Sequence, residues 1–85
     1  MKNLVLIGGG NHAHYTIDII EKQGEHMIVG IIDSLLPLHL ERFGYKVIGR
    51  QENIRELIKL FNIHEAIISV GDNWSRHVIY QEISH

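Results

Sequence analysis

The chain of 85 residues has no cysteine, a single proline and few aromatic residues, and these scarcities narrow what it can be. Without cysteine it forms neither a disulfide bond nor a thiolate zinc site. The formal net charge of −2 leaves no surplus of positive charge for nucleic acid. No apolar run approaches the ~20 residues of a membrane span, and the run after Lys2 is too short for a signal peptide. We expect one small cytoplasmic domain, residues 1–85, that binds neither nucleic acid nor membrane.

Short apolar runs alternate with amphipathic segments along the chain. The apolar runs predict buried strands, because strands of a parallel sheet covered on both faces show little alternation. The amphipathic segments place apolar residues at helical spacing, as Ile54, Leu57 and Phe61 do. We expect strands over 3–7, 27–32, 45–48 and 65–70, and helices over 12–23, 51–61 and 74–83.

The alternation of strands and helices predicts an α/β fold. We expect a small Rossmann-like, three-layer domain, in which a mostly parallel four-stranded sheet carries helices on both faces. Asn11 and Gly24 are suited to the two ends of the first helix. The segment 34–43 contains Pro37, and we expect an irregular loop there with room for a short helical piece.

Gly8, Gly9 and Gly10 separate the first expected strand from the first expected helix. Together with Ala13 they fit the pattern G-x-G-x-x-[G/A], whose glycines allow a tight turn and the close approach of a ligand to the backbone. Free N–H groups and the helix dipole favour an anion at such a helix start. The pattern predicts a phosphate-binding turn, and a tight turn that binds nothing is the alternative.

Other candidate residues fall at the same edge of the expected sheet. Asp33 ends the second strand, where an acidic residue accepts hydrogen bonds from a ribose in dinucleotide-binding folds. His12, in the first helical turn, has a ring that can donate to a phosphate or sugar oxygen, with capping or packing as the alternative. The last strand is followed by a turn that either contacts the ligand or caps the next helix, formed by Gly71, Asp72 and Asn73.

The remaining polar residues carry weaker signals. His14 and Arg42 are expected at the surface, and Glu65 at the opposite edge of the sheet, away from the site. His12 and His14 are two positions apart, so they diverge on a helix and form no metal site. No triad or carboxylate pair is apparent, and we therefore expect no catalytic residue and no bound metal.

Several blocks resemble one family in the right order. Lys2 to Ala13 is similar to the start of the NeuD/PglD-type sugar acyltransferases, which include sialic acid O-acetyltransferases and UDP-amino-sugar N-acetyltransferases. The blocks 17–20, 28–33, 44–49 and 66–73 are similar as well. The resemblance implies a Rossmann-like N-terminal domain that binds the acceptor, a nucleotide sugar or sialic acid. Its binding residues would be Gly8, Gly9, Gly10, Asn11, His12, Asp33, Gly71, Asp72 and Asn73.

In that family the catalytic histidine and the acetyl-coenzyme A site lie on a trimeric left-handed β-helix built from hexapeptide repeats. The 85 residues show no such repeat. The resemblance therefore implies a domain that binds no cofactor of its own and is inactive alone, while the full-length enzyme uses acetyl-coenzyme A and trimerises through the β-helix. Two alternatives stay open: an NAD(P)-binding module of an oxidoreductase, and a nucleotide-sensing or assembly module.

Overall fold

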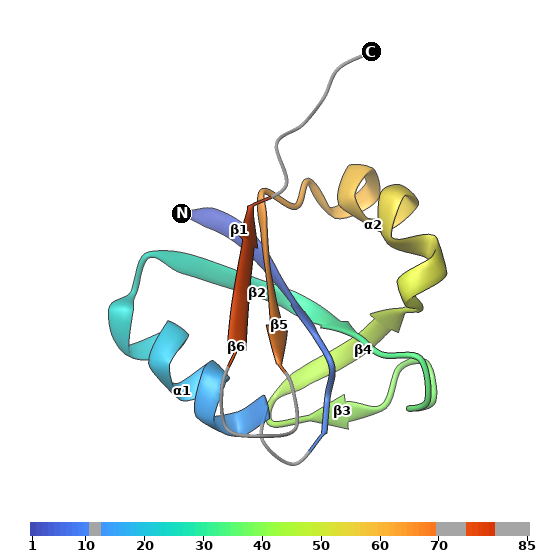
Figure 1. The fold of residues 1–85 in the computed structure, drawn as a ribbon, viewed down its shortest axis with the longest axis horizontal. Coiled ribbons are helices and arrows are strands. Elements are labelled where there is room, and N and C mark those ends of the chain that lie inside the picture. The colour runs from blue at the N-terminus through green and yellow to red at the C-terminus, as the bar shows by residue number, and fades with distance from the viewer. Residues whose placement is uncertain (11–12, 70–74, 80–85) are drawn as a thin grey trace.

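The computed structural model describes residues 1–10, 13–69 and 75–79, the last of these by their backbone alone. The described chain forms one sheet with a helix on each face (Figure 1). The elements in chain order are β1 (Lys2–Ile7), α1 (Ala13–Gln23), β2 (His26–Ile32), β3 (Glu41–Arg42), β4 (Tyr45–Gly49), the 3-10 turn η1 (Gln51–Asn53), α2 (Ile54–Phe61), β5 (Glu65–Ser69) and β6 (Ser75–Ile79).

The sheet has the strand order β3-β4-β2-β1-β5-β6. β1 lies at its centre and pairs in parallel with β2 and β5, and β2 pairs in parallel with β4. Parallel strands need long crossovers, and α1 and α2 provide two of them. The expected α/β, mostly parallel, Rossmann-like fold is confirmed. The expected number of strands is wrong, because β3 and β6 add an antiparallel strand at each edge and bring the described total to six.

The expectation of a third helix over 74–83 is wrong for the part of this segment that the structure describes. Ser75 to Ile79 form β6, which runs antiparallel to β5 with Glu65 opposite Ile79 and Ser69 opposite Ser75. The pairing satisfies backbone groups along the open edge of β5, and the β-branched Val78 and Ile79 suit a strand. The other positions of that expected helix, and Val70 of the preceding strand, lie outside the described residues.

The loop after β2 also differs from expectation, since it contains no helical piece. Its end pairs with β4 as the two-residue strand β3. Phe43 and Gly44 join β3 to β4 with φ angles of 55° and 90°. Positive φ at both central positions is typical of a type I′ hairpin turn.

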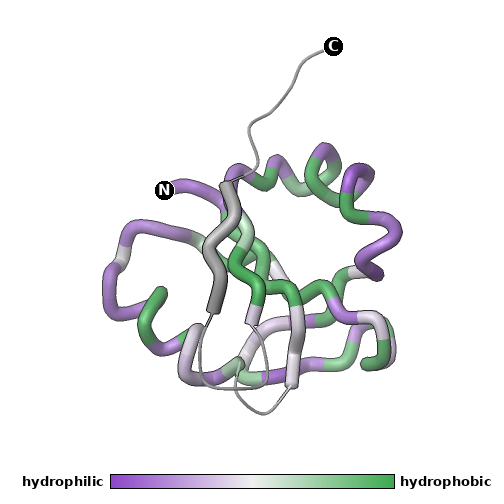
Figure 2. Tube along the Cα trace, viewed as in Figure 1, coloured by the Kyte–Doolittle hydropathy of each residue, from purple (hydrophilic) through white to green (hydrophobic). Residues whose placement is uncertain are grey.

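The apolar residues of β1 alternate between the two faces of the sheet, as successive strand residues must. On one face Leu4 and Leu6 pack with Ile17 and Ile20 of α1. On the other face Val5 and Ile7 pack with the α2 side of the core. Figure 2 shows this hydrophobic centre flanked by helices that are polar on their outer sides. The expectation of helices on both faces is therefore confirmed.

The ends of the helices follow local rules. α1 ends at Gln23 as expected, and Gly24 takes a φ of 69° while its N–H donates to the carbonyl of Ile20 at 3.3 Å. α2 begins later than expected, because η1 forms the first three positions of the 51–61 segment. Within the described part of the chain, neither helix is long and apolar enough to cross a membrane.

Candidate functional site

Gly8 turns the chain at the carboxyl end of β1. Its N–H donates to the carbonyl of Ile32 at 2.7 Å, and its φ is 98°. A Cβ at this position would lie 2.8 Å from the carbonyl oxygen of Ser69, at the end of β5. Both the left-handed backbone and the close approach of β5 exclude a side chain here. Gly8 therefore places the turn where the ends of β1, β2 and β5 meet.

Gly9 is buried, and its surroundings are already filled. Its N–H donates to Oδ2 of Asp33 at 2.8 Å. A Cβ on Gly9 would lie 2.8 Å from Cδ1 of Leu36 and 3.1 Å from Cγ2 of Ile31. The N–H of Gly9 is thus used within the protein, and Leu36 covers this side of the turn.

Gly10 differs from the two glycines before it because it is exposed. Among the described residues other than its chain neighbours, no heavy atom lies within 4 Å of the position that a Cβ would take. Its carbonyl accepts a hydrogen bond from the N–H of Ala13 at 3.0 Å, at the start of α1. Gly10 is therefore an exposed glycine at the start of a helix, uncovered by the described part of the chain.

The carboxylate of Asp33 is held by main-chain donors. Oδ1 accepts the N–H groups of Leu35 and Leu36 at 2.8 and 2.9 Å, and Oδ2 accepts that of Gly9. Burial acts to raise the pKa of Asp33, but these three hydrogen bonds and the charge of Arg50 outweigh it and lower the pKa below its usual value. A carboxylate has about four acceptor positions, so one of them remains, on Oδ2.

Arg50 supports the same turn from the end of β4. Its Nη1 donates to the carbonyl of Asp33 at 2.9 Å and also to the carbonyl of Leu36. The two bonds clamp the segment 33–36, and with it the carboxylate and Leu36. Arg50 was not among the residues expected at the site. Its position directly after the strand that ends at Gly49 is the signal that could have found it, since carboxyl ends of parallel strands share one edge.

The structure thus brings Gly9 and Asp33 into direct contact, places Gly8 against Ile32 and Ser69, and leaves Gly10 exposed beside them. The other expected binding residues lie outside the described part of the chain: Asn11, His12, Gly71, Asp72 and Asn73. Among the residues that are described, no group of three or more His, Asp and Glu side chains is placed to hold a metal ion.

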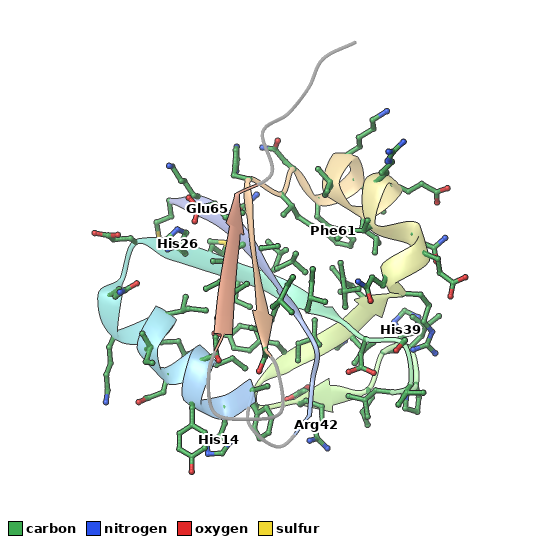
Figure 3. The ribbon with its side chains drawn as sticks, in the orientation of Figure 1. His14, His26, His39, Arg42, Phe61 and Glu65 are labelled. Carbon is green, nitrogen blue, oxygen red and sulfur yellow. The ribbon has the colours of Figure 1, made fainter. Side chains whose placement is uncertain are left out.

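The opposite end of the sheet holds a second carboxylate. Glu65 is only 5% exposed, and its Oε2 lies 2.7 Å from Nε2 of His26. Nζ of Lys2 lies 3.5 Å from Oε1. Figure 3 shows His26 and Glu65 facing each other far from Arg42, which lies at the end where the glycine turn is. The expectation that Glu65 lies away from the site holds, but its burial and pairing were missed.

A mostly parallel sheet with a helix on each face, and with a glycine turn between β1 and α1 at its carboxyl end, defines a Rossmann-like α/β domain. A family model described as the PglD N-terminal domain matches residues 3–83. The chain therefore belongs to this family, the N-terminal domain of PglD/NeuD-type acetyltransferases, and the expected resemblance is confirmed. Neither the curated proteins nor the solved structures gave a match.

Proposed function

We propose that this domain binds the acceptor of a sugar acetyltransferase, a nucleotide sugar or sialic acid, at the carboxyl end of the sheet. The observation that carries the proposal is that Gly10 is exposed at the start of α1 and that none of the described residues beyond its chain neighbours covers it. Membership of the PglD N-terminal domain family supports the acetyltransferase context.

In this proposal, different residues of the site contact different groups of the ligand. A phosphate or carboxylate of the ligand approaches the backbone at Gly10, where the N-terminus of α1 contributes partial positive charge. A hydroxyl donates to the remaining acceptor position on Oδ2 of Asp33. Gly8 and Gly9 shape the turn between these two points. Asn11, His12, Gly71, Asp72 and Asn73 complete the site in this proposal.

In this proposal the domain binds its ligand and does not turn it over. The acetyl-coenzyme A and the catalytic histidine belong to the trimeric β-helix of the whole enzyme, as the family resemblance implies. A cytoplasmic location, where nucleotide sugars and acetyl-coenzyme A are found, is part of the same proposal.

Isothermal titration calorimetry of the chain against UDP-sugars, CMP-sialic acid and UDP tests the proposal. Gly10→Asp fills the open space with a negative charge, so we expect at least about a tenfold loss of affinity, or 1.4 kcal/mol. Leu60→Asp is the matched control, because Leu60 is 76% exposed on α2. Absence of heat with every ligand, or equal losses in both variants, would contradict the proposal.

An NAD(P)-binding module is the second candidate, because Asp33 stands where dinucleotide-binding folds place their ribose-binding acid. The carboxylate of Asp33 already accepts three main-chain hydrogen bonds. These bonds favour the first proposal, since the single remaining acceptor position suits one hydroxyl better than the two hydroxyls of a ribose. A fluorescence titration with NADH separates the two. An assembly module, the third alternative, predicts a dimer or larger species by light scattering.

A further inference from the structure

An open groove of about 390 Å³ lies between α1 and the β3–β4 hairpin. Its volume is within the range of about 300–1,000 Å³ that is usual for small-molecule sites. Among the described residues, five of α1 and one of the hairpin line it, and none of these belongs to the glycine-turn site: His14, Tyr15, Ile17, Asp18, Glu21 and Phe43.

One end of the groove is aromatic and exposed. The ring centroid of His14 lies 3.9 Å from that of Tyr15 and 5.5 Å from that of Phe43, with the rings tilted by 36° and 44°. Tyr15 is 57% exposed and Phe43 42% exposed. The guanidinium of Arg42 lies 5.1 Å from the centre of the Phe43 ring. Tilted rings offer several separate faces rather than the parallel slot that would clasp a flat base.

The other end of the groove is acidic. Asp18 pairs with Lys22 at 3.0 Å, and Glu21 accepts the hydroxyl hydrogen of Tyr45 at 2.6 Å. Each contact uses only part of the acceptor capacity of a carboxylate. Hydroxyl groups of a ligand can therefore donate here, whereas phosphates and carboxylates are repelled.

The groove begins next to the glycine turn. His14 lies in the first turn of α1, and Figure 3 shows His14 and Arg42 at the same end of the molecule. The eight residues from His14 to Glu21 cover about 10 Å of helix. A ligand with an anion at Gly10 can therefore extend an uncharged part along α1.

We propose that the groove binds an uncharged pyranose ring. Aromatic faces carry negative charge and attract the C–H face of a sugar, and carboxylates accept from its hydroxyl rim. The inference rests on the proposed function in one respect: the ring belongs to a ligand whose phosphate lies at the glycine turn. It also narrows that function, since the carboxylates favour a neutral sugar over the acidic sialic acid.

Tyr15→Ala and Phe43→Asn remove the aromatic faces. The second change suits the positive φ of Phe43 and creates an Asn-Gly pair, which favours this type of turn. We expect each variant to bind UDP-glucose at least about fivefold more weakly and UDP as tightly as the unchanged chain. Leu60→Ala is the control for loss of an exposed apolar side chain. UDP-glucose affinities equal to that of the control would overturn the inference while leaving the proposed function intact.

Backbone amide NMR of the chain with methyl glucoside and with glucuronate isolates the ring from the phosphate. We expect methyl glucoside at millimolar concentration to shift the signals of His14, Tyr15 and Phe43, and glucuronate to shift them less. If these shifts occur while UDP fails to bind, the groove stands as a site for a separate saccharide and the proposed function fails. Equal shifts with both sugars, or none, overturn the inference.

Discussion

The two ends of the sheet stabilise a buried or half-buried carboxylate by different means. At the carboxyl end Asp33 accepts three main-chain N–H groups, from a turn that Arg50 clamps. At the amino end Glu65 is held by the side chains of His26 and Lys2.

The two ends of the sheet are therefore sensitive to different kinds of substitution. Main-chain donors are present whatever the side chains are, so the carboxyl end depends on the path of the backbone and on the glycines that permit it. The amino end depends on the identity of two side chains, either of which one substitution removes. Substitutions at the two ends should therefore differ in how much stability they remove.

Gly8→Ala should have the largest effect, because it disturbs the backbone path itself. The new Cβ would meet the Ser69 carbonyl in a left-handed conformation, and we expect a loss of at least about 3 kcal/mol in the free energy of unfolding. Urea denaturation measures it, and far-UV circular dichroism covers the case in which the variant does not fold. Gly10→Ala is the control, with a change within about 0.5 kcal/mol. Equal stability of the two variants would contradict the role given to Gly8.

Glu65→Ala tests the amino end and should cost about 2 kcal/mol, because it removes the buried carboxylate that lies against the ring of His26. Urea denaturation at neutral pH measures the loss. Lys2→Ala serves as the comparison, since the Lys2 side chain is 67% exposed and a surface ion pair contributes at most about 1 kcal/mol. A larger loss for Lys2→Ala than for Glu65→Ala would show that the pair with His26 is not the main support.

Asp33→Asn tests the carboxyl end and should cost about 1 kcal/mol at neutral pH. The folded pKa of Asp33 lies below the usual 3.8, so its charge stabilises the fold above that pH. The stabilisation disappears as the pH falls through the lowered pKa. The difference in stability between the unchanged chain and the variant should therefore shrink in acid. A difference that stays constant down to the lowest pH at which the chain folds would refute this.

Tyr45 should show the smallest effect, since its partner Glu21 is an exposed carboxylate. Burial, with the hydrogen bond to Glu21 and its charge, raises the pKa of Tyr45 from 10.0 to about 12. Its contribution to stability is present below pH 10 and is lost as the pH rises towards 12. Ultraviolet titration should show an ionisation near pH 12 that is absent in Tyr45→Phe, and this variant should lose about 0.5 kcal/mol of stability at neutral pH. If the ionisation at high pH is unchanged in Tyr45→Phe, it belongs to another tyrosine and the prediction is wrong.

The elements buried on both sides could be predicted from the sequence. β1, β2 and β5 are continuous apolar runs, and α1 and α2 show clear helical spacing. β6 could not, because a short segment with two adjacent apolar residues fits a helix or a strand. Its state depends on the open edge of β5, which periodicity along the chain does not reveal.

The candidate site was predicted as a set of residues and not as a set of contacts. The glycine pattern located Gly8, Gly9 and Gly10, and its spacing located Asp33. That Asp33 would bond Gly9 depends on the turn 33–36, which Arg50 clamps and which places Leu36 over Gly9. Such contacts arise from packing between segments distant in sequence, so local patterns do not contain them.

The antiparallel direction of β6 has a practical consequence. Glu65 lies opposite Ile79 on one side and opposite Leu4 on the other. The start of β1 and the end of β6 therefore lie at the same end of the sheet, the amino end. Gly10 lies at the opposite, carboxyl end of the sheet. A dye, a resin linker or a biosensor surface attached at the start of β1 or the end of β6 therefore lies at the end of the sheet opposite the exposed Gly10.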